Sequence, residues 1–423
     1  MLSIHKTTLS NKLRVIVAPM SSIESVSIFI VVRAGSRFET IKNNGIAHFL
    51  EHMFFKGGDR YKTPYDVAAA VDAVGGEFNA WTSPETVGYY VKVAKENISL
   101  AFDVLSDMLL NSKFRDEDID REKGVIVEEY NMYQDIPRSI LADEFQELMY
   151  GEHSLGRRVL GDMKFIRSVS KKDFVDYRKQ LYATPNIVVS VAGNTSISEV
   201  NKLIRKYLVL PESGKKNTPI PYKLKQSTKP KVKIINKKTE QAHLILGVPA
   251  FGAQDARKYI ADIIAVVLGG GMSSRLFTSI RERHGLAYYI NASHDSYSDA
   301  GDLTISAGVN IKKIDLAIRL IVEELKNLIH SPISAEELKK NKEDIIGQLV
   351  LRLERSDFIA QGLANQELIT NKIETIDEIK RKYRAVTVEQ VQKLAKDLFE
   401  TNKIHLAVIG PYTDKAKFVK LVK

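Results

Sequence analysis

Two histidines and one glutamate fall within residues 48–52, His-Phe-Leu-Glu-His. Side chains four residues apart lie on the same face of a helix, so His48 and His52 can bind one metal ion. Glu51 stands beside them, where its carboxylate can take a proton from a water molecule without binding the ion itself. This is the inverted form of a known zinc-site motif, with two ligands and a general base in one helical turn. The chemistry that it indicates is metal-assisted hydrolysis.

The residues around this motif predict a helix. Asn43 and Asn44 are candidate N-caps, and glycines at 57–58 are a stop signal. Apolar residues with the spacing of a buried helical stripe lie between them: Ile46, Phe49, Leu50 and Met53. The motif residues and Phe55 form a second face. The alternative is a coincidental surface trio, which a chain with nine histidines produces at a low rate.

A tetrahedral catalytic zinc site needs a third protein ligand and one open position. The candidate lies on a helix predicted to begin near Asp116, where Glu122 and Glu129 fall on an otherwise apolar face. Buried carboxylates are costly unless a cation or a donor satisfies them, so we assign Glu129 as the ligand and Glu122 as a supporting carboxylate. Glu128 points about 100° away and is expected to be solvated. The alternative is that Glu122 and Glu129 pair with lysines.

The composition limits the class of protein. The chain has 423 residues, 44% hydrophobic and 27% charged, which is ordinary for a globular protein of two or three domains. It has no cysteine, so disulfides and thiolate metal sites are excluded. The sequence predicts no membrane span and no signal peptide. We therefore expect a cytoplasmic protein, and a trimmed organellar protein is the alternative.

The net charge of +10 is spread along the chain and is densest at residues 215–238, which also contain three prolines. This pattern is typical of a solvated linker between domains, and attraction to acidic partners is the alternative. No nucleic-acid-binding motif accompanies the basic segment. Nucleic acid is therefore not an expected partner.

The two halves of the sequence repeat at a nearly constant offset. Residues 98–102 match 314–318, and residues 187–193 match 404–410, at offsets of 216 and 217. Similar segments that recur at nearly the same offset indicate an internal duplication. We expect an α+β fold of two homologous domains, each a mainly antiparallel sheet covered by helices on one face. Strand candidates in the first half are 26–32, 78–82, 89–93 and 187–192. The predicted parts are a zinc-binding domain at 1–210, a linker at 211–231 and a degenerate second copy at 232–423.

The second half keeps the scaffold and lacks the metal-binding groups. Alignment of the predicted helices places Asn341 opposite Glu122 and Gln348 opposite Glu129. The second half also contains no His-x-x-Glu-His. Loss of all these groups together is expected if they form one site, so we predict one active copy and one degenerate copy.

These residues resemble the pitrilysin family of zinc metallopeptidases, in the half-length branch that includes the mitochondrial processing peptidases. The resemblance covers essentially the whole chain. Its specific parts are residues 48–57 and the segment 121–129, which looks like the family's ligand helix. The roles that it implies are one zinc ion per chain bound by His48, His52 and Glu129, a general base in Glu51, and an outer carboxylate in Glu122.

Residues 76–82 are similar to the family's edge strand, which pairs with an extended substrate. An exposed strand edge offers backbone groups that hold a peptide independent of its side chains. The alternative is an ordinary core strand. The substrate-binding residues that the resemblance implies are Phe78, Asn79, Ala80, Trp81 and Thr82.

Arg281 and Tyr288, in the second half, keep the spacing of seven residues that active family members use on the substrate near the metal. The resemblance implies that Tyr288 stabilises the oxyanion and that Arg281 holds the substrate backbone or terminus. From the residues alone, a structural role is the alternative. The glycine-rich segment 269–275 also resembles the family, and it lacks the Gly-Lys-Ser/Thr ending of a phosphate loop.

The family architecture implies a partner. Full-length members are clamshells of four such domains, with the metal on the first and the Arg/Tyr pair on the fourth, so this chain resembles half of a clamshell. We expect a homodimer with two sites, and a heterodimer with a paralogue is the alternative. The expected function is a zinc metalloendopeptidase that acts on peptides or on unfolded or precursor segments. The rival is a non-catalytic structural subunit of a larger complex.

Overall fold

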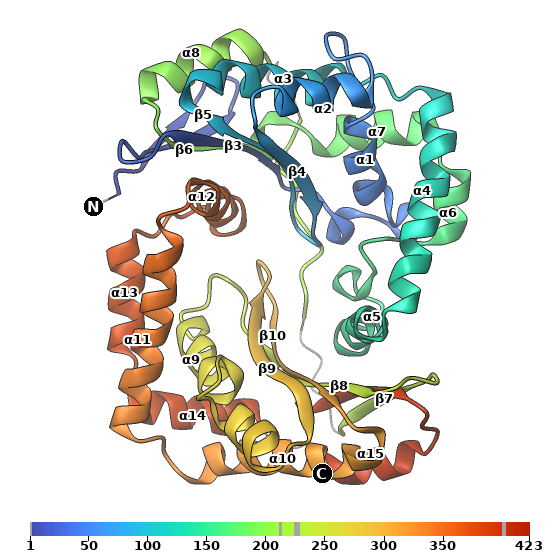
Figure 1. Cartoon of the computed structure of the whole chain (residues 1–423), viewed down its shortest axis with the longest axis vertical. Coiled ribbons are helices and arrows are strands. Elements are labelled where there is room, and N and C mark those ends of the chain that lie inside the picture. Colours follow the sequence, from blue (N-terminus) through green and yellow to red (C-terminus); the bar gives the residue numbers. More distant parts are fainter. Residues whose placement is uncertain (1, 211–213, 224–228, 400–402) are drawn as a thin grey trace. The chain divides into compact units, whose positions relative to one another are not determined.

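The structure is a computed structural model of the chain, and it describes residues 2–210, 214–223, 229–399 and 403–423 (Figure 1). Two compact units make up the chain. Unit 1 consists of Met1–Asn131, Arg157–Ile220 and Leu351–Ile373, and unit 2 of Met132–Gly156, Pro221–Val350 and Glu374–Lys423. Parts of the linker predicted at 211–231, namely 211–213 and 224–228, lie outside the described residues.

Unit 1 is built on a six-stranded sheet with the order β1-β2-β6-β3-β5-β4. Only β2 and β6 pair in parallel; the other neighbours are antiparallel. The four predicted strands are present, with ends within two residues of those expected, and β4 lies at the edge of the sheet. The strand bounds are β1 (His5–Thr8), β2 (Arg14–Pro19), β3 (Ser25–Val32), β4 (Glu77–Thr82), β5 (Val87–Ala94) and β6 (Ile187–Gly193).

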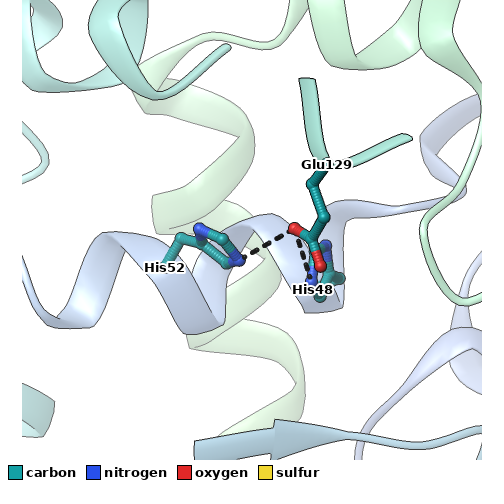
Figure 2. Close-up of side chains that lie close together, drawn as sticks. All are labelled: His48, His52 and Glu129. Carbon is teal, nitrogen blue, oxygen red and sulfur yellow. Dashed lines mark ion pairs between the residues drawn. The ribbon is translucent and has the colours of Figure 1, made fainter. Parts of the chain in front are cut away.

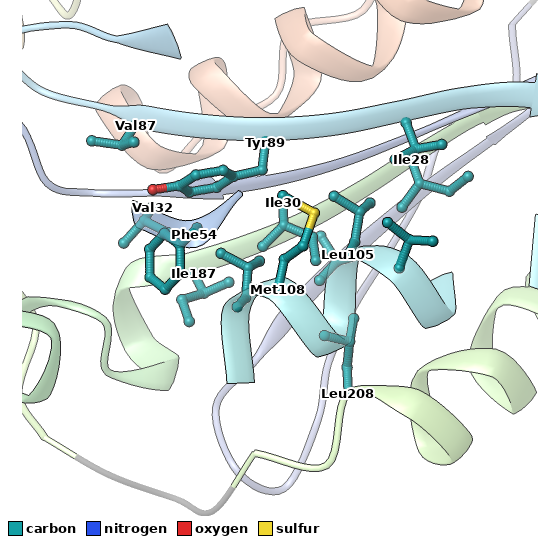
Figure 3. Close-up of a cluster of buried hydrophobic side chains, with 14 of the residues drawn as sticks. Ile28, Ile30, Val32, Phe54, Val87, Tyr89, Leu105, Met108, Ile187 and Leu208 are labelled. Carbon is teal, nitrogen blue, oxygen red and sulfur yellow. The ribbon is translucent and has the colours of Figure 1, made fainter. Parts of the chain in front are cut away.

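Helices cover both faces of this sheet. On one face, α1, α2, α3, α7 and α8 enclose the main core, part of which is drawn in Figure 3. On the opposite face α12 packs against β2, β3 and β6 (Figure 1). The helix bounds are α1 (Ile46–Phe54), α2 (Pro64–Asp72), α3 (Ile98–Asn111), α4 (Asp116–Asp135), α6 (Met163–Ser168), α7 (Lys171–Leu181), α8 (Ile197–Tyr207) and α12 (Ser356–Thr370).

Unit 2 repeats the same plan. Its five strands have the order β7-β11-β8-β10-β9. Strand for strand, this corresponds to β2-β6-β3-β5-β4 of unit 1. The strand bounds are β7 (Lys231–Asn236), β8 (Ala242–Ala250), β9 (Ala287–Ser296), β10 (Gly301–Val309) and β11 (His405–Gly410). The helix bounds are α5 (Pro137–Tyr150), α9 (Lys258–Gly269), α10 (Ile314–His330), α11 (Ala335–Arg352), α13 (Ile376–Ala385), α14 (Val388–Leu398) and α15 (Lys415–Leu421).

The two halves of the chain exchange one helix each. Helix α5 comes from the first half and packs on β7, β8 and β11, whereas α12 comes from the second half and packs on the sheet of unit 1. Strands β3 and β6 are buried almost throughout, on both faces of the sheet of unit 1. The second face of this sheet therefore also needs an apolar cover, which α12 supplies. The sequence predicts helices on one face only. The boundaries predicted at 1–210 and 232–423 therefore do not coincide with the compact units.

No helix in the described parts of the chain is both long and apolar enough to cross a membrane.

Candidate metal centre

Helix α1 buries one face and presents its polar motif on the other. The predicted apolar stripe is confirmed, because Ile46, Phe49, Leu50 and Met53 are each at most 1% exposed. The stripe fixes the rotation of the helix, so the side chains of His48, Glu51 and His52 share the opposite face. These three residues are buried or half-buried, which is unusual for a coincidental surface trio.

The start of α1 differs from the prediction. Asn43 and Asn44 do not cap the helix; the N-cap is Gly45, whose φ of 104° is in the region that favours glycine. The carboxylate of Glu39 takes over the capping role, accepting hydrogen bonds at 2.8 Å from the backbone amides of Gly45 and Ala47. Burial raises the pKa of Glu39 to about 7, although these hydrogen bonds act to lower it. No local pattern points to a capping side chain that lies six residues before the N-cap.

Helix α4 brings the third predicted ligand to the two histidines. Figure 2 shows the carboxylate of Glu129 directed at both imidazoles. Its Oε2 atom lies 3.6 Å from Nε2 of His48 and 3.5 Å from Nε2 of His52. One ligand atom from each residue lies within 4.8 Å of the other two. Side chains that are some 80 residues apart in sequence therefore converge on one point.

This arrangement fits a tetrahedral zinc ion. Two ligand atoms that each lie about 2 Å from a tetrahedral ion are roughly 3.3 Å apart, close to the distances found here and too long for good hydrogen bonds. Oε2 of Glu129 is buried and has no hydrogen-bond partner in the described structure. Burial and the neighbouring His52 lower the pKa of His48 to about 3, so its imidazole is neutral and can donate a lone pair. A cation would satisfy these groups.

Glu122 supports the site from behind His52. Its Oε1 lies 2.8 Å from Nδ1 of His52, and its Oε2 pairs with Lys56. Burial would raise the pKa of Glu122, but the hydrogen bonds from His52 and Lys56 together lower it below its ordinary value. The carboxylate is therefore ionised, so Nδ1 of His52 must carry the proton, and Nε2 is free to bind a metal. Neighbouring Glu128 is exposed, as predicted.

Glu51 lies on the same face and is held by a residue that sequence reasoning assigned elsewhere. The hydroxyl of Thr82, at the end of β4, donates a 2.5 Å hydrogen bond to Oε2 of Glu51. Burial raises the pKa of Glu51, and the hydrogen bond from Thr82 partly opposes this shift. Nothing in the sequence pattern indicates this contact, because residues 51 and 82 are joined only by the packing of α1 against β4.

Strand β4 contains the residues predicted to bind substrate, and it occupies an edge of the sheet as expected. Its side chains alternate between the two faces. Phe78 contacts Phe55, the residue that follows α1, with ring centroids 5.8 Å apart. Trp81 lies on the other face, beside Phe29 and over Gly88. A Cβ atom at position 88 would lie 2.0 Å from the Trp81 ring, so only glycine fits beneath it. The side chain of Trp81 thus has a packing role in the sheet.

Arg281 and Tyr288 lie in unit 2, whereas the metal-binding residues lie in unit 1. The guanidinium carbon of Arg281 is 5.9 Å from the ring centroid of Tyr288, so the structure brings these two residues together. Tyr288 is 75% exposed on β9, the edge strand of its sheet. Both are thus accessible to a ligand or to another chain.

Within the residues that the structure describes, the second copy has no equivalent centre. Asn341 and Gln348, the counterparts of Glu122 and Glu129, lie on α11, and Asn341 donates a hydrogen bond to the carbonyl of Glu337. The group of His48, His52 and Glu129 is the one possible metal site found among the described residues. Among the described residues, the candidate metal ligands are therefore confined to the first repeat.

Comparison with known proteins agrees with this division. The profile "Insulinase (Peptidase family M16)" matches residues 14–163, and the profile "Peptidase M16 inactive domain" matches residues 168–345. The uncharacterized zinc protease YmxG of Bacillus subtilis is 38% identical over 96% of this chain and 98% of its own length. The uncharacterized zinc protease SCO5738 of Streptomyces coelicolor is 32% identical over 98% of this chain and 91% of its own length.

Solved structures share the fold. A protease from Helicobacter pylori superimposes with a TM-score of 0.90 over 97% of this chain and 100% of that chain, at 23% identity. A chain of Complex III2 from Candida albicans superimposes with a TM-score of 0.85 over 99% of this chain and 100% of that chain, at 18% identity. The resemblance inferred from the motifs is confirmed by relatives above 30% identity along nearly the whole chain. The protein belongs to peptidase family M16.

Proposed function

We propose that this protein is a zinc-dependent endopeptidase that hydrolyses peptides or unfolded segments of proteins. The observation that carries the proposal is the convergence of His48, His52 and Glu129 on one point, with Glu51 on the same helix face. One zinc ion per chain would be held by these three residues. When bound, zinc lowers the pKa of a coordinated water and polarises the scissile carbonyl.

The side chains of the chain itself have distinct tasks. Glu51 takes a proton from the attacking water and returns it to the leaving amine. Thr82 holds the carboxylate of Glu51 in one orientation through its 2.5 Å hydrogen bond. Glu122 keeps the proton of His52 on Nδ1, which fixes the tautomer and the ring orientation that metal binding needs.

The exposed edge of β4 is suited to hold an extended peptide by backbone hydrogen bonds, beside Thr82 and the metal-binding helix. Recognition of this kind tolerates many side chains. We expect cleavage within unfolded segments of varied sequence. Residues 78–82 would supply the pairing groups.

We propose further that Arg281 and Tyr288 of one subunit complete the site of another subunit in a homodimer. Tyr288 would stabilise the oxyanion, and Arg281 would hold the substrate backbone. A mixing experiment tests this directly. The variants Glu51→Gln and Tyr288→Phe should each lose most of their activity. A heterodimer of the two should retain one intact site, made of Glu51 from one subunit and Tyr288 from the other.

Random mixing of these two variants should therefore restore about a quarter of wild-type activity. Variants that combine both changes in one chain should restore nothing when mixed with either parent. Failure of the two single variants to complement, in a mixture shown to exchange subunits, would overturn the shared site. A paralogous partner would be indicated if the protein alone stays inactive and monomeric.

The peptidase assignment itself is tested by zinc analysis together with cleavage of a quenched fluorescent peptide. Wild-type protein should bind one zinc per chain and lose activity when a chelator removes it. The Glu51→Gln variant should keep the zinc and lose about 10²–10⁴-fold in kcat. Protein that binds no zinc and cleaves no peptide would favour the rival, a structural subunit. Normal turnover by Glu51→Gln would remove Glu51 from the mechanism.

A further inference from the structure

A cavity of about 480 Å³ lies inside unit 1. Its floor is made by Ile30 and Val32 of β3 and by Ile187 and Val189 of β6. Three of these side chains, Ile30, Val32 and Ile187, are drawn in the core of Figure 3. Its walls come from the end of α3, from α7 and from the segment after α8. The volume is within the range of small-molecule binding pockets, roughly 300–1,000 Å³.

The cavity is distinct from the metal centre. Phe54, on the buried side of α1, packs against two residues that line the cavity: its ring centroid is 5.9 Å from that of Phe114 and 5.6 Å from that of Tyr182. None of His48, Glu51, His52 and Glu129 lines it. A molecule in the cavity would therefore not touch the proposed zinc site.

Helix α7 supplies one wall and part of the mouth. Lys171, Val175 and Arg178 are spaced four and three residues apart, so they share one face of the helix and all line the cavity. Val175 is 44% exposed, which is high for a valine. This face of α7 is therefore apolar at its centre, with basic residues on either side.

The charge of the lining is entirely positive. Lys113, Lys171, Arg178 and Lys179 line the cavity, and no acidic side chain does so in the part of the chain that the structure describes. Lys113 pairs with Asp59, which does not itself line the cavity. Lys171 and Lys179 form no ion pair with the described residues, and Arg178 donates a hydrogen bond to the carbonyl of Leu110, at 2.7 Å. Burial lowers the pKa of the Arg178 guanidinium, so this cation is partly desolvated without a carboxylate beside it.

An apolar cavity with unpaired cations at its mouth is complementary to a molecule with an apolar chain and an anionic head. We propose that this cavity binds a single-chain fatty carboxylate, with the chain inside the cavity past Val175 and the carboxylate near Lys171, Arg178 and Lys179. The four aliphatic floor residues offer no polar atoms to a second polar group on the chain. The ligand is therefore expected to be unsubstituted along most of its length.

The test uses the full-length protein and dodecanoate below its micelle concentration, measured by isothermal titration calorimetry. One saturable site per chain is expected. Substitution Val175→Trp would fill the mouth and should abolish this binding. The matched control is Val209→Trp, at a valine that is 72% exposed and does not line the cavity. That variant should bind as the wild type does.

A second pair of variants tests the charge. The double substitution Lys171→Ala, Lys179→Ala should weaken dodecanoate binding on the order of tenfold, because two partly exposed cations that attract the carboxylate are removed. Lys172→Ala is the control on the same helix, at an exposed lysine that pairs with Asp176 and does not line the cavity. Dodecanol, which has no charge, should bind to the wild type more weakly than dodecanoate does. Its affinity should be the same for the Lys171/Lys179 double variant and for Lys172→Ala.

Three results would overturn the proposal. The first is the absence of a saturable site for dodecanoate, and the second is unchanged binding by a folded Val175→Trp variant. The third is equal affinity for dodecanol and dodecanoate. Circular dichroism and zinc content report folding of each variant independently of the lipid, since none of the metal-binding residues lines the cavity. Val175→Trp should retain peptidase activity.

Discussion

Nδ1 of His52 donates a 2.8 Å hydrogen bond to the ionised carboxylate of Glu122, while Nε2 of the same ring faces Glu129 at 3.5 Å. The imidazole of His52 is thus held at Nδ1 by the buried carboxylate of Glu122, and its Nε2 is open to a metal ion. This relationship links the two helices of the centre, because His52 belongs to α1 and both acids belong to α4. It also predicts that residues outside the ligand set control metal affinity.

Replacement of Glu122 by Gln should lower zinc affinity about 10–100-fold, the usual effect of removing an outer carboxylate from a metal-binding histidine. The Gln side chain can keep a neutral hydrogen bond to His52 but cannot supply the charge. Competition with a chromogenic chelator measures the change. Glu117→Gln, at an exposed position of the same helix, is the control and should leave the affinity unchanged. Equal affinities in the two variants would contradict the supporting role.

Replacement of Glu129 by Gln should have a larger effect on zinc affinity than loss of Glu122, because the ligand itself is removed. The second repeat already carries Gln at the corresponding position 348, and its described residues contain no candidate metal site. Glu128→Gln is the matched control, one residue away and exposed. Metal analysis after dialysis should find zinc in the control and little in Glu129→Gln. Full occupancy in Glu129→Gln would assign the third ligand elsewhere.

Thr82→Val should lower kcat on the order of tenfold with unchanged zinc content, because a hydrogen bond to a charged group contributes about 1.5–3 kcal/mol. Valine has nearly the same shape and removes only the hydroxyl that orients Glu51. Thr82→Ser restores the hydroxyl and should recover most of the activity. Comparable losses in both variants would mean that Thr82 acts through packing of the edge strand instead.

Stability should depend on pH through Asp302, which accepts a 2.6 Å hydrogen bond from Tyr150 inside unit 2. Burial raises the pKa of Asp302 from 3.8 to about 7, with nearby Asp295 acting in the same direction and His294 opposing it. Between about pH 4 and 7 the unfolded chain loses this proton while the folded protein keeps it. The free energy of unfolding should therefore fall as pH rises through this window, by up to about 1.4 kcal/mol per pH unit from this group.

Asp302→Asn should remove this contribution and flatten the pH dependence of unfolding by urea. Glu39, whose pKa is also raised to about 7, remains in both proteins and contributes equally to each. The difference between the free energies of unfolding of the wild type and Asp302→Asn, followed against pH, therefore reports the contribution of Asp302 alone. Parallel pH profiles would show that Asp302 does not titrate in this window.

Local spacing explains why the core of the site could be predicted from the sequence. His48 and His52 are four residues apart on one helix, so their shared face follows from helix geometry. Glu129 could be assigned because a carboxylate on an apolar helix face requires a partner. The edge position of β4 followed from the family resemblance, and the strand order confirms it.

The parts that could not be predicted depend on contacts between distant segments. The cap of α1 by Glu39 and the hydrogen bond from Thr82 to Glu51 arise from tertiary packing, and neither residue carries a local signal. The exchange of α5 and α12 between the halves is of the same kind. No local pattern in the sequence shows which sheet each of these two helices covers.

Anomalous diffraction from zinc-loaded crystals at the zinc absorption edge tests the central claim most directly. The account predicts one peak per chain, about 2.0–2.2 Å from Nε2 of His48, Nε2 of His52 and a carboxylate oxygen of Glu129. A peak at other residues, or no peak in protein that still cleaves peptides, would contradict it.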